Sequence, residues 1–290
     1  MASYRFDAIG TSWKIDIRDP LSQTQEEDLF LALVSRIAMY DQTYSRFRDD
    51  SLVGEMSRNA GTYKLPDDSE KLFSLYRKIY DLTRGKVTPL IGSVLVAAGY
   101  DAAYTLQQRE ELISPPPWDD VFSFCEKTII MHRPMILDIG AGGKGHLIDI
   151  IGELLVREGI GSYVIDAGGD ILEKNSDDHT IRVGLEHPRD ATQVIGVAQI
   201  SNQSICGSAG NRRVWNGFHH IIDPFLLKSP TDLLAVWVVA DSAFVADILT
   251  TALFFVSPEV LMPHFDFSYI LVLHDGSFTR SAGFPAEFFV

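Results

Sequence analysis

The stretch LDIGAGGKGHLID at residues 137–149 joins an apolar segment to a pattern with helical spacing. Residues 135–139 predict a strand, and apolar side chains within residues 146–158 predict a helix. Glycines let the backbone approach a ligand closely, and a helix N-terminus offers free N–H groups and a positive dipole end. Because Lys144 adds a cation there, the stretch predicts a phosphate site or, as the alternative, only a tight strand–helix turn.

Two common nucleotide-binding motifs do not fit this stretch. It lacks the GxxxxGK[ST] spacing of a P-loop, including the Ser or Thr that should follow the lysine. Residues 140–145 match GxGxxG, but the flanking βαβ pattern of a dinucleotide-binding fold is absent. We therefore expect neither fold.

Outward from this stretch, helices and strands are interspersed without strict βαβ alternation. Helical patterns occur at residues 25–40, 70–84, 146–158 and 241–256. Strand patterns occur at residues 6–17, 128–132, 135–139, 162–166, 181–185, 194–200, 233–239 and 268–274, and the strand at 233–239 is apolar enough to be covered on both faces. This order indicates an α+β fold with antiparallel or mixed sheets packed against helices.

The 290-residue chain is longer than a usual domain but within the range of single domains. We expect one domain over residues 1–290, with an excursion near residues 101–125. The polar residues 106–122, which include three consecutive prolines, predict a loop outside the core.

Charge and composition limit the function. The net charge of −14 disfavours nucleic acid and anionic lipid as partners, although Arg212 and Arg213 form a local basic spot. The two cysteines, Cys125 and Cys206, lie outside any CxxC motif and predict reduced thiols. With no signal-peptide pattern, lipobox or long apolar run, we expect a soluble protein without membrane insertion, either cytoplasmic or exported with its signal removed.

A possible metal site lies in the predicted helix at residues 241–256. Asp247 and Thr251 are four residues apart and therefore share one helix face. A carboxylate and a hydroxyl at this spacing can both reach Mg²⁺, which prefers oxygen ligands. The alternative is an acidic residue and a threonine with structural roles only.

Two further segments carry polar groups with more than one possible role. His219 and His220 precede an Asp-Pro turn, where a histidine can act as acid, base or phosphate ligand or can be structural. Residues 207–213 combine small side chains with arginines, a composition that suits either an anion-binding loop or a flexible surface loop.

Taken together, these segments resemble the FAD:protein FMN transferase family, also called the ApbE family. The similarity covers nearly the whole chain in the correct order: Gly10-Thr11-Ser12; Ser45-Arg46-Phe47 with Asp50-Ser51; Pro89-Leu90 and Gly99-Tyr100; residues 138–145, like D-L-G-x-x-x-K-G; residues 164–170, like V-N-x-G-G-D; residues 205–213, like A-T-S-G-x-Y-R-R; residues 220–224, which match H-I-I-D-P; and residues 246–253, like A-D-x-L-x-T-A-L.

The resemblance implies an ApbE-like, T-fold-like fold and Mg²⁺-dependent transfer of FMN from FAD to a Thr or Ser hydroxyl of a target flavoprotein, with release of AMP. It implies Mg²⁺ ligands at Asp247, Thr251 and the carbonyl of Ala141. It implies FAD contacts at Ile9, Phe47, Val87, Thr88, Asp138, Lys144, His220 and Ile221. His220 is the candidate for assisting proton transfer or holding the phosphate; Asp247 is the competing catalytic candidate, although a metal-bound carboxylate is a poor base.

The chain departs from the family pattern at several positions. Ile9 replaces a methionine, Thr88 precedes a proline where many members have aspartate, Gly207 replaces a threonine, and Asn211 replaces a tyrosine. Two alternatives to transfer therefore stay open. One is an FAD pyrophosphatase that produces FMN and AMP, and the other is an FAD-binding protein without turnover.

Overall fold

The main sheet has eight strands, and every neighbouring pair is antiparallel. The computed structural model describes residues 2–108, 110–177, 179–211 and 214–289. In spatial order the strands are β1 (Ala2–Ala8), β2 (Thr11–Ile17), β6 (Tyr163–Ala167), β7 (Asp170–Lys174), β10 (Ser204–Ala209), β11 (Leu233–Ala240), β12 (Ser268–Leu273) and β13 (Phe278–Arg280). The prediction of an α+β fold with antiparallel sheets is confirmed.

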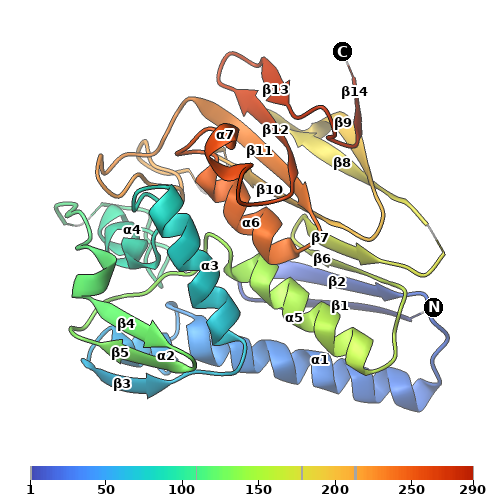
Figure 1. The fold of residues 1–290 in the computed structure, drawn as a ribbon, viewed down its shortest axis with the longest axis horizontal. Helices are drawn as coiled ribbons and strands as arrows, with labels where there is room; N and C mark the ends of the chain where they lie inside the picture. The colour runs from blue at the N-terminus through green and yellow to red at the C-terminus, as the bar shows by residue number, and fades with distance from the viewer. Residues whose placement is uncertain (1, 109, 178, 212–213, 290) are drawn as a thin grey trace.

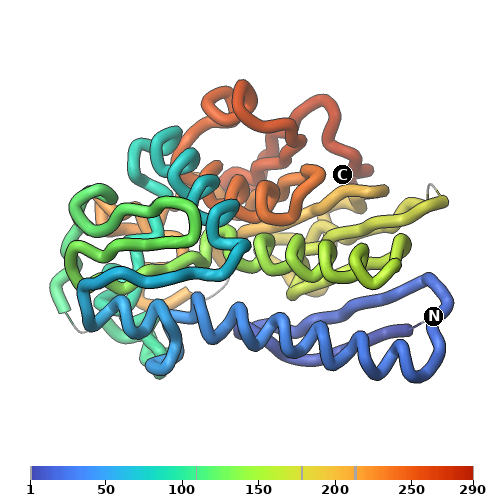
Figure 2. Tube along the Cα trace, turned by 60° about the horizontal axis from the view of Figure 1, so that its bottom comes forward, coloured from blue at the N-terminus to red at the C-terminus, as the bar shows by residue number. Residues whose placement is uncertain are grey.

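Three helices cover one face of this sheet. They are α1 (Gln23–Tyr44), α5 (Gly143–Arg157) and α6 (Ala243–Ala252), with α5 packed between the other two (Figures 1 and 2). Ser22 begins α1 through a capping box with Gln25, and Ser242 caps α6. Apolar side chains from the helices and the sheet form a hydrophobic core, called the first core below.

A second sheet packs on the opposite face, in the order β14 (Ala286–Phe288), β9 (Asp190–Ile200) and β8 (Ile181–His187). Its Leu185 and Ala198 share a core with Ile205 and Val239 of the main sheet. Strand β11 contributes Val236 and Val238 to the first core, so its apolar run is covered on both faces as predicted.

The elements between α1 and α5 form a lobe beside the helices (Figure 1). They are α2 (Leu52–Met56), β3 (Gly61–Lys64), α3 (Ser69–Leu82), the 3₁₀ turn Pro89–Ile91, α4 (Gly92–Ala98), the 3₁₀ turn Trp118–Asp120, β4 (Phe122–Cys125) and β5 (Thr128–Met131). The strands form the sheet β3-β5-β4. The short helix α7 (Pro258–Leu261) follows α6 in the chain and precedes β12.

The prediction that residues 106–122 lie outside the core is wrong at their C-terminal end. Trp118, Val121 and Phe122 are buried in the first core, where the Trp118 and Phe122 rings lie 4.6 Å apart. Polar neighbours and prolines hide this short apolar segment in the sequence.

The predicted strand at residues 135–139 is also wrong. This segment is not part of a sheet; its backbone instead bonds to two separate elements, through Met135 N–H to the Met56 carbonyl at 3.2 Å and Asp138 N–H to the Pro89 carbonyl at 2.7 Å. The helix after it begins at Gly143 and not at residue 146, so half of the glycine-rich stretch is helical.

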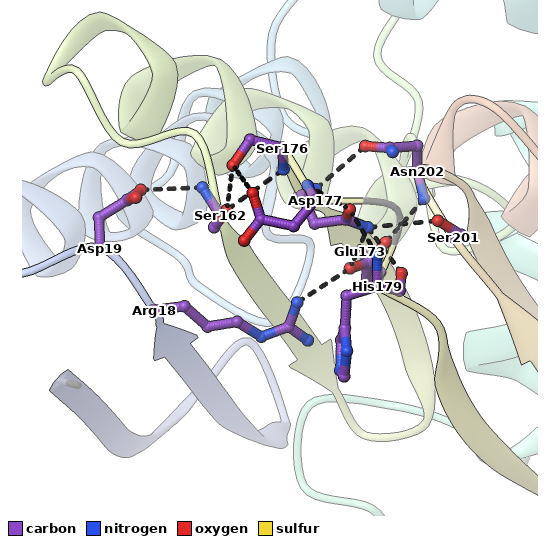
Figure 3. Close-up of polar contacts among 10 residues, drawn as sticks. Arg18, Asp19, Ser162, Glu173, Ser176, Asp177, His179, Ser201 and Asn202 are labelled. Atoms are coloured by element: carbon purple, nitrogen blue, oxygen red, sulfur yellow. Dashed lines mark hydrogen bonds and ion pairs between the residues drawn. The ribbon is translucent and has the colours of Figure 1, made fainter.

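A polar network surrounds Glu173, which is fully buried in β7 of the main sheet. Its carboxylate accepts hydrogen bonds from Arg18 at 3.3 Å, from the Asn175 side chain at 2.8 Å and from the Asn202 N–H at 2.6 Å (Figure 3). Because every donor comes from a different loop or strand end, the network fixes these connections to each other.

Two remaining expectations concern cysteines and the membrane. Neither cysteine forms a disulfide; Cys206 is buried, whereas Cys125 is exposed. Within the described ranges, no helix combines the length and apolar character needed to cross a membrane.

Candidate functional site

A cavity of about 640 Å³ lies where the β1–β2 turn, the start of α5 and helix α6 meet. Such a volume is within the range of small-molecule sites, roughly 300–1,000 Å³. The cavity is lined by all the site residues predicted above: Ile9, Phe47, Val87, Thr88, Asp138, Ala141, Lys144, His220, Ile221, Asp247 and Thr251.

Oxygen atoms from the two motifs meet at one end of the cavity. The Thr251 hydroxyl donates to the Ala141 carbonyl at 3.4 Å. One turn earlier on α6, Asp247 accepts a 2.8 Å hydrogen bond from the Gly145 N–H through Oδ2. A carboxylate, a hydroxyl and a carbonyl are therefore grouped between α5 and α6, and all three are ligand types that suit Mg²⁺.

The glycines of the stretch mainly allow this close helix packing. A Cβ atom on Gly145 would lie 2.2 Å from the Ala243 carbonyl oxygen, and one on Gly142 would lie 2.9 Å from the Ile248 Cβ. The expectation that these glycines clear space for a ligand is therefore only partly right, because Gly142 and Gly145 clear space for α6.

Charged side chains surround the oxygen atoms of Asp247, Thr251 and Ala141. Lys144 forms an ion pair with Asp170, which is buried and also accepts the Gly207 N–H at 3.0 Å. Burial raises the pKa of Asp247 to about 8, and the negative charge of Asp170 adds to this rise. Burial alone would lower the pKa of Lys144, but Asp170 and Asp247 raise it above its usual value. Lys144 therefore stays a cation beside two carboxyl groups.

Asp149, the last residue of the quoted stretch, positions α6 and does not line the cavity. Its carboxylate accepts hydrogen bonds from the Ser242 hydroxyl at 2.6 Å and from the N–H groups of Ala243 and Phe244 at 2.9 and 3.1 Å. These N–H groups belong to the first turn of α6, where a carboxylate is favoured. Helix α5 thus holds the helix that carries Asp247 and Thr251.

The other end of the cavity is aromatic. The Arg46 guanidinium lies 4.1 Å from the ring centre of Phe47 and pairs through Nε with Asp138. The second oxygen of Asp138 accepts the Gly140 N–H at 2.6 Å. Asp138 therefore links Arg46 to the glycine-rich stretch.

Several predicted FAD contacts also have structural roles. The Thr88 hydroxyl accepts the Leu90 N–H at 3.2 Å and so caps the 3₁₀ turn after it. Val87 is buried, and its N–H bonds to the Thr83 hydroxyl at 3.1 Å. Ile9 adopts a positive φ of 44° in the turn between β1 and β2.

The two neighbouring histidines have different environments. His219 is buried, and its Nε2 lies 2.9 Å from the Pro230 carbonyl, whereas His220 lines the cavity. Asp223 accepts the N–H groups of Phe225 and Leu226 and forms a 3.0 Å ion pair with Lys86, which confirms the predicted turn.

The segment at residues 207–213 begins in a strand and not in a loop. Gly207 lies in β10 directly opposite Trp237 of β11, and a Cβ atom there would lie 2.8 Å from the indole nitrogen. A side chain larger than that of glycine at this position would meet Trp237. The predicted basic spot at Arg212 and Arg213 lies outside the described residues.

Three residues with strong claims to the site were missed by sequence reasoning: Arg46, Tyr104 and Asp170. Arg46 and Asp170 lie inside the quoted motifs, so their motif position could have identified them. Tyr104 lies in the excursion near residues 101–125, where the sequence carries no signal for a cavity.

Comparison with known proteins gives consistent relatives. An FAD:protein FMN transferase of Klebsiella pneumoniae is 25% identical over 251 residues, which cover 80% of this chain and 76% of that protein. An FAD:protein FMN transferase of Treponema pallidum is 23% identical over 287 residues, covering 87% and 77%.

Solved structures show the same fold. The ApbE protein of Thermotoga maritima superposes with a TM-score of 0.81 at 20% identity and covers 99% of both chains. The flavin transferase ApbE of Vibrio cholerae gives a TM-score of 0.79 at 16% identity, with 97% of this chain and 96% of that chain covered. A family model described as the ApbE family matches residues 9–266. The chain therefore belongs to the ApbE family.

Proposed function

We propose that this protein transfers the FMN half of FAD to a Thr or Ser hydroxyl of an acceptor flavoprotein. The acceptor oxygen forms a new bond to the FMN phosphorus, the P–O bond to the AMP phosphate breaks, the hydroxyl proton leaves to a base, and AMP is released. The observation that carries the proposal is the single cavity in which both motifs, the HIIDP histidine and the aromatic residue Phe47 meet. The names of the family's relatives support the same reaction.

Oxygen donors at one end of the cavity fit Mg²⁺. Asp247, the Thr251 hydroxyl and the Ala141 carbonyl would hold the ion, and none of them is a soft ligand. Bound there, Mg²⁺ would neutralise charge on the pyrophosphate, which is the main requirement of phosphoryl transfer.

The charge balance of the cavity supports the need for such a cation. Its lysine and arginine side chains within the described ranges are each paired with a carboxylate: Arg46 with Asp138, Arg48 with Asp41 and Asp50, Lys86 with Asp223, and Lys144 with Asp170. These cations leave little net positive charge for a diphosphate.

Protein groups supply the remaining contacts. Lys144 is close to Asp247 and 30% exposed through its side chain, so it can reach a phosphate oxygen from the cavity wall. His220 can accept the acceptor's proton or hold the phosphate, because a neutral imidazole has both a donor and an acceptor nitrogen.

The test is an incubation of the protein with FAD and MgCl₂, with and without an acceptor protein of the Klebsiella pneumoniae relative. AMP is measured by chromatography, and covalent flavin by fluorescence of the denatured acceptor on a gel. We expect AMP release together with fluorescent acceptor. AMP without labelled acceptor would replace transfer by FAD hydrolysis, and FAD binding without AMP would reduce the protein to a flavin-binding module.

A further inference from the structure

Tyr76 is a side chain that lies outside the cavity lining but contacts the glycine-rich stretch. It belongs to α3 and is fully buried, with its ring centre 6.4 Å from that of Phe244 on α6. A buried tyrosine hydroxyl usually needs a hydrogen-bond partner. Tyr76 has two, because its hydroxyl donates to the Ile139 carbonyl at 2.6 Å and accepts the Gly142 N–H at 3.1 Å. It therefore bridges the two ends of the turn that leads into α5.

The Ile139 carbonyl does not hold this turn by itself. It accepts the N–H groups of Gly142 and Gly143 at 3.2 and 2.7 Å, in addition to the Tyr76 hydroxyl. A carbonyl oxygen has two lone pairs, so three donors compete for them. The bond from Gly142 is the longest of the three. The Tyr76 hydroxyl therefore supplies the acceptor that the Gly142 N–H does not share with its neighbour.

The Gly142 N–H and the Ala141 carbonyl belong to the same peptide unit. In a planar trans peptide these two groups point in opposite directions. The hydrogen bond from the N–H to Tyr76 therefore turns the carbonyl away from Tyr76. The Thr251 hydroxyl donates to this carbonyl at 3.4 Å, and Asp247 lies one turn earlier on the same helix. Tyr76 thus acts on an oxygen atom of the cavity through the peptide plane.

Packing alone does not fix the orientation of this peptide. Helix α6 lies directly against Gly142, where a Cβ atom would be 2.9 Å from the Ile248 Cβ and 2.9 Å from the Phe244 ring. This contact holds the Cα atom in place. A peptide plane can still rotate between two fixed Cα atoms, and glycine has no side chain to hinder the rotation. The hydrogen bond to Tyr76 opposes it.

We propose that Tyr76 is a positioning residue for the metal: its hydroxyl holds the Ala141–Gly142 peptide so that the Ala141 carbonyl faces α6 before Mg²⁺ binds. This inference rests on the proposed function, which assigns that carbonyl to the ion. Mg²⁺ demands near-ideal octahedral geometry, so a ligand that is oriented in advance improves its binding. The peptide is ordered when α3 packs against the stretch and not when the ion arrives.

Two substitutions separate this role from a purely structural one. Tyr76→Phe keeps the ring and removes the hydroxyl, so that among the described residues the Gly142 N–H keeps only the shared Ile139 carbonyl. Tyr163→Phe is the matched control. Tyr163 is also fully buried, and its hydroxyl donates to the Gly152 carbonyl at 3.3 Å, outside the cavity lining. If Tyr76 only stabilises the fold, both variants should bind metal equally well.

The first measurement is the Kd of Mg²⁺, from calorimetric titration of MgCl₂ into the metal-free protein. We expect Tyr76→Phe to raise this Kd roughly fivefold, the size of one neutral hydrogen bond, and Tyr163→Phe to leave it unchanged. In AMP release from FAD, Tyr76→Phe should need correspondingly more MgCl₂ for the half-maximal rate. It should reach the wild-type rate at saturation, because the bound ion then orients the carbonyl.

The second measurement is hydrogen exchange of the glycine amides, followed by NMR on protein with isotope-labelled glycine. In metal-free wild type the Gly142 N–H should already exchange slowly, and MgCl₂ should change its rate little. In Tyr76→Phe it should exchange faster, whereas the Gly143 N–H, which keeps the Ile139 carbonyl, should not. The wild-type comparison does not depend on how well the variant folds.

An equal Kd of Mg²⁺ in wild type and Tyr76→Phe, or an equal rise in Tyr163→Phe, would overturn the inference. A Gly142 N–H that becomes protected only after MgCl₂ is added would also overturn it, since the ion would then orient the peptide. A wild type that binds Mg²⁺ but releases no AMP sinks the proposed function instead, and the Kd and exchange comparisons still decide the role of Tyr76. A wild type that binds no Mg²⁺ overturns both.

Discussion

At the scale of single residues, His146 shows that a motif residue can serve the fold and not the ligand. It is 2% exposed, lies outside the cavity lining, and packs its ring against Phe244 with centres 4.8 Å apart. The Tyr40 hydroxyl donates its hydrogen to the Gly143 carbonyl at 2.8 Å. Nδ1 of His146 lies 3.2 Å from the Tyr40 hydroxyl oxygen and therefore donates to it. Burial lowers the pKa of His146 to about 3.

This lowered pKa predicts acid sensitivity. The unfolded chain takes up a proton on His146 near pH 6.5, whereas the folded protein resists it down to about pH 3. His146 therefore contributes to the free energy of unfolding above pH 6.5, and this contribution is lost as the pH falls below that value. The loss is about 2 kcal/mol between pH 6.5 and pH 5.

Urea unfolding of wild type and His146→Phe across this pH range checks the prediction. Phenylalanine keeps the contact with Phe244 and cannot titrate. The difference in unfolding free energy between the two proteins should change with pH in favour of the variant at low pH. Parallel curves would contradict the buried neutral histidine.

The cavity residues that the sequence predicts and those that it does not predict differ in how far along the chain they lie from the residues they contact. Asp247 and Thr251 were found because a four-residue spacing on one helix places them together without knowledge of the fold. The contact of Arg46 with Asp138 joins residues far apart in the chain. The close approach of Gly207 to Trp237 depends on the pairing of two neighbouring strands. Such contacts follow from register and topology, which a single sequence does not show.

At the scale of elements, the site depends on the packing of α5 against α6. The glycine-rich stretch allows the close approach, and Asp149 binds the N-terminus of α6. The helices themselves were predictable from apolar periodicity. The strand expected at residues 135–139 was not correct, because a short apolar run has the same pattern whether it joins a sheet or crosses between elements.

The role of Asp149 predicts that Asp149→Asn destabilises the protein. The substitution places an amide donor beside N–H groups and a hydroxyl that all need an acceptor. We expect a loss of about 1–3 kcal/mol in the free energy of unfolding, measured with urea. Asp247→Asn is the matched control, since it replaces a buried carboxyl group near Asp170 by an amide and keeps an acceptor for the Gly145 N–H. Equal losses in both variants would argue against a specific anchor for α6.

At the scale of the whole molecule, a chain of net charge −14 has to bind a substrate with a negatively charged diphosphate. Long-range repulsion slows such an encounter, and salt screens it over about 10 Å at 0.1 M. The lysine and arginine side chains of the cavity are paired with carboxylates, so they do not reverse the negative electrostatic potential around the protein.

We therefore expect the association rate of FAD, measured by stopped-flow fluorescence, to rise severalfold between low and moderate KCl concentrations. Riboflavin, which has no phosphate, is the control and should show little change. A rate for FAD that falls with salt would mean that a positive local field guides the substrate.

We propose that Asp247, Thr251 and Ala141 form the metal-dependent centre at which FAD is cleaved. The most direct measurement is AMP release from FAD by wild type and Asp247→Asn, each with MgCl₂ and with EDTA. We predict that the wild type releases AMP only with Mg²⁺, and that Asp247→Asn folds as stably as wild type but loses activity about a hundredfold or more. Undiminished, Mg²⁺-dependent AMP release by Asp247→Asn would show that Asp247 does not hold the metal.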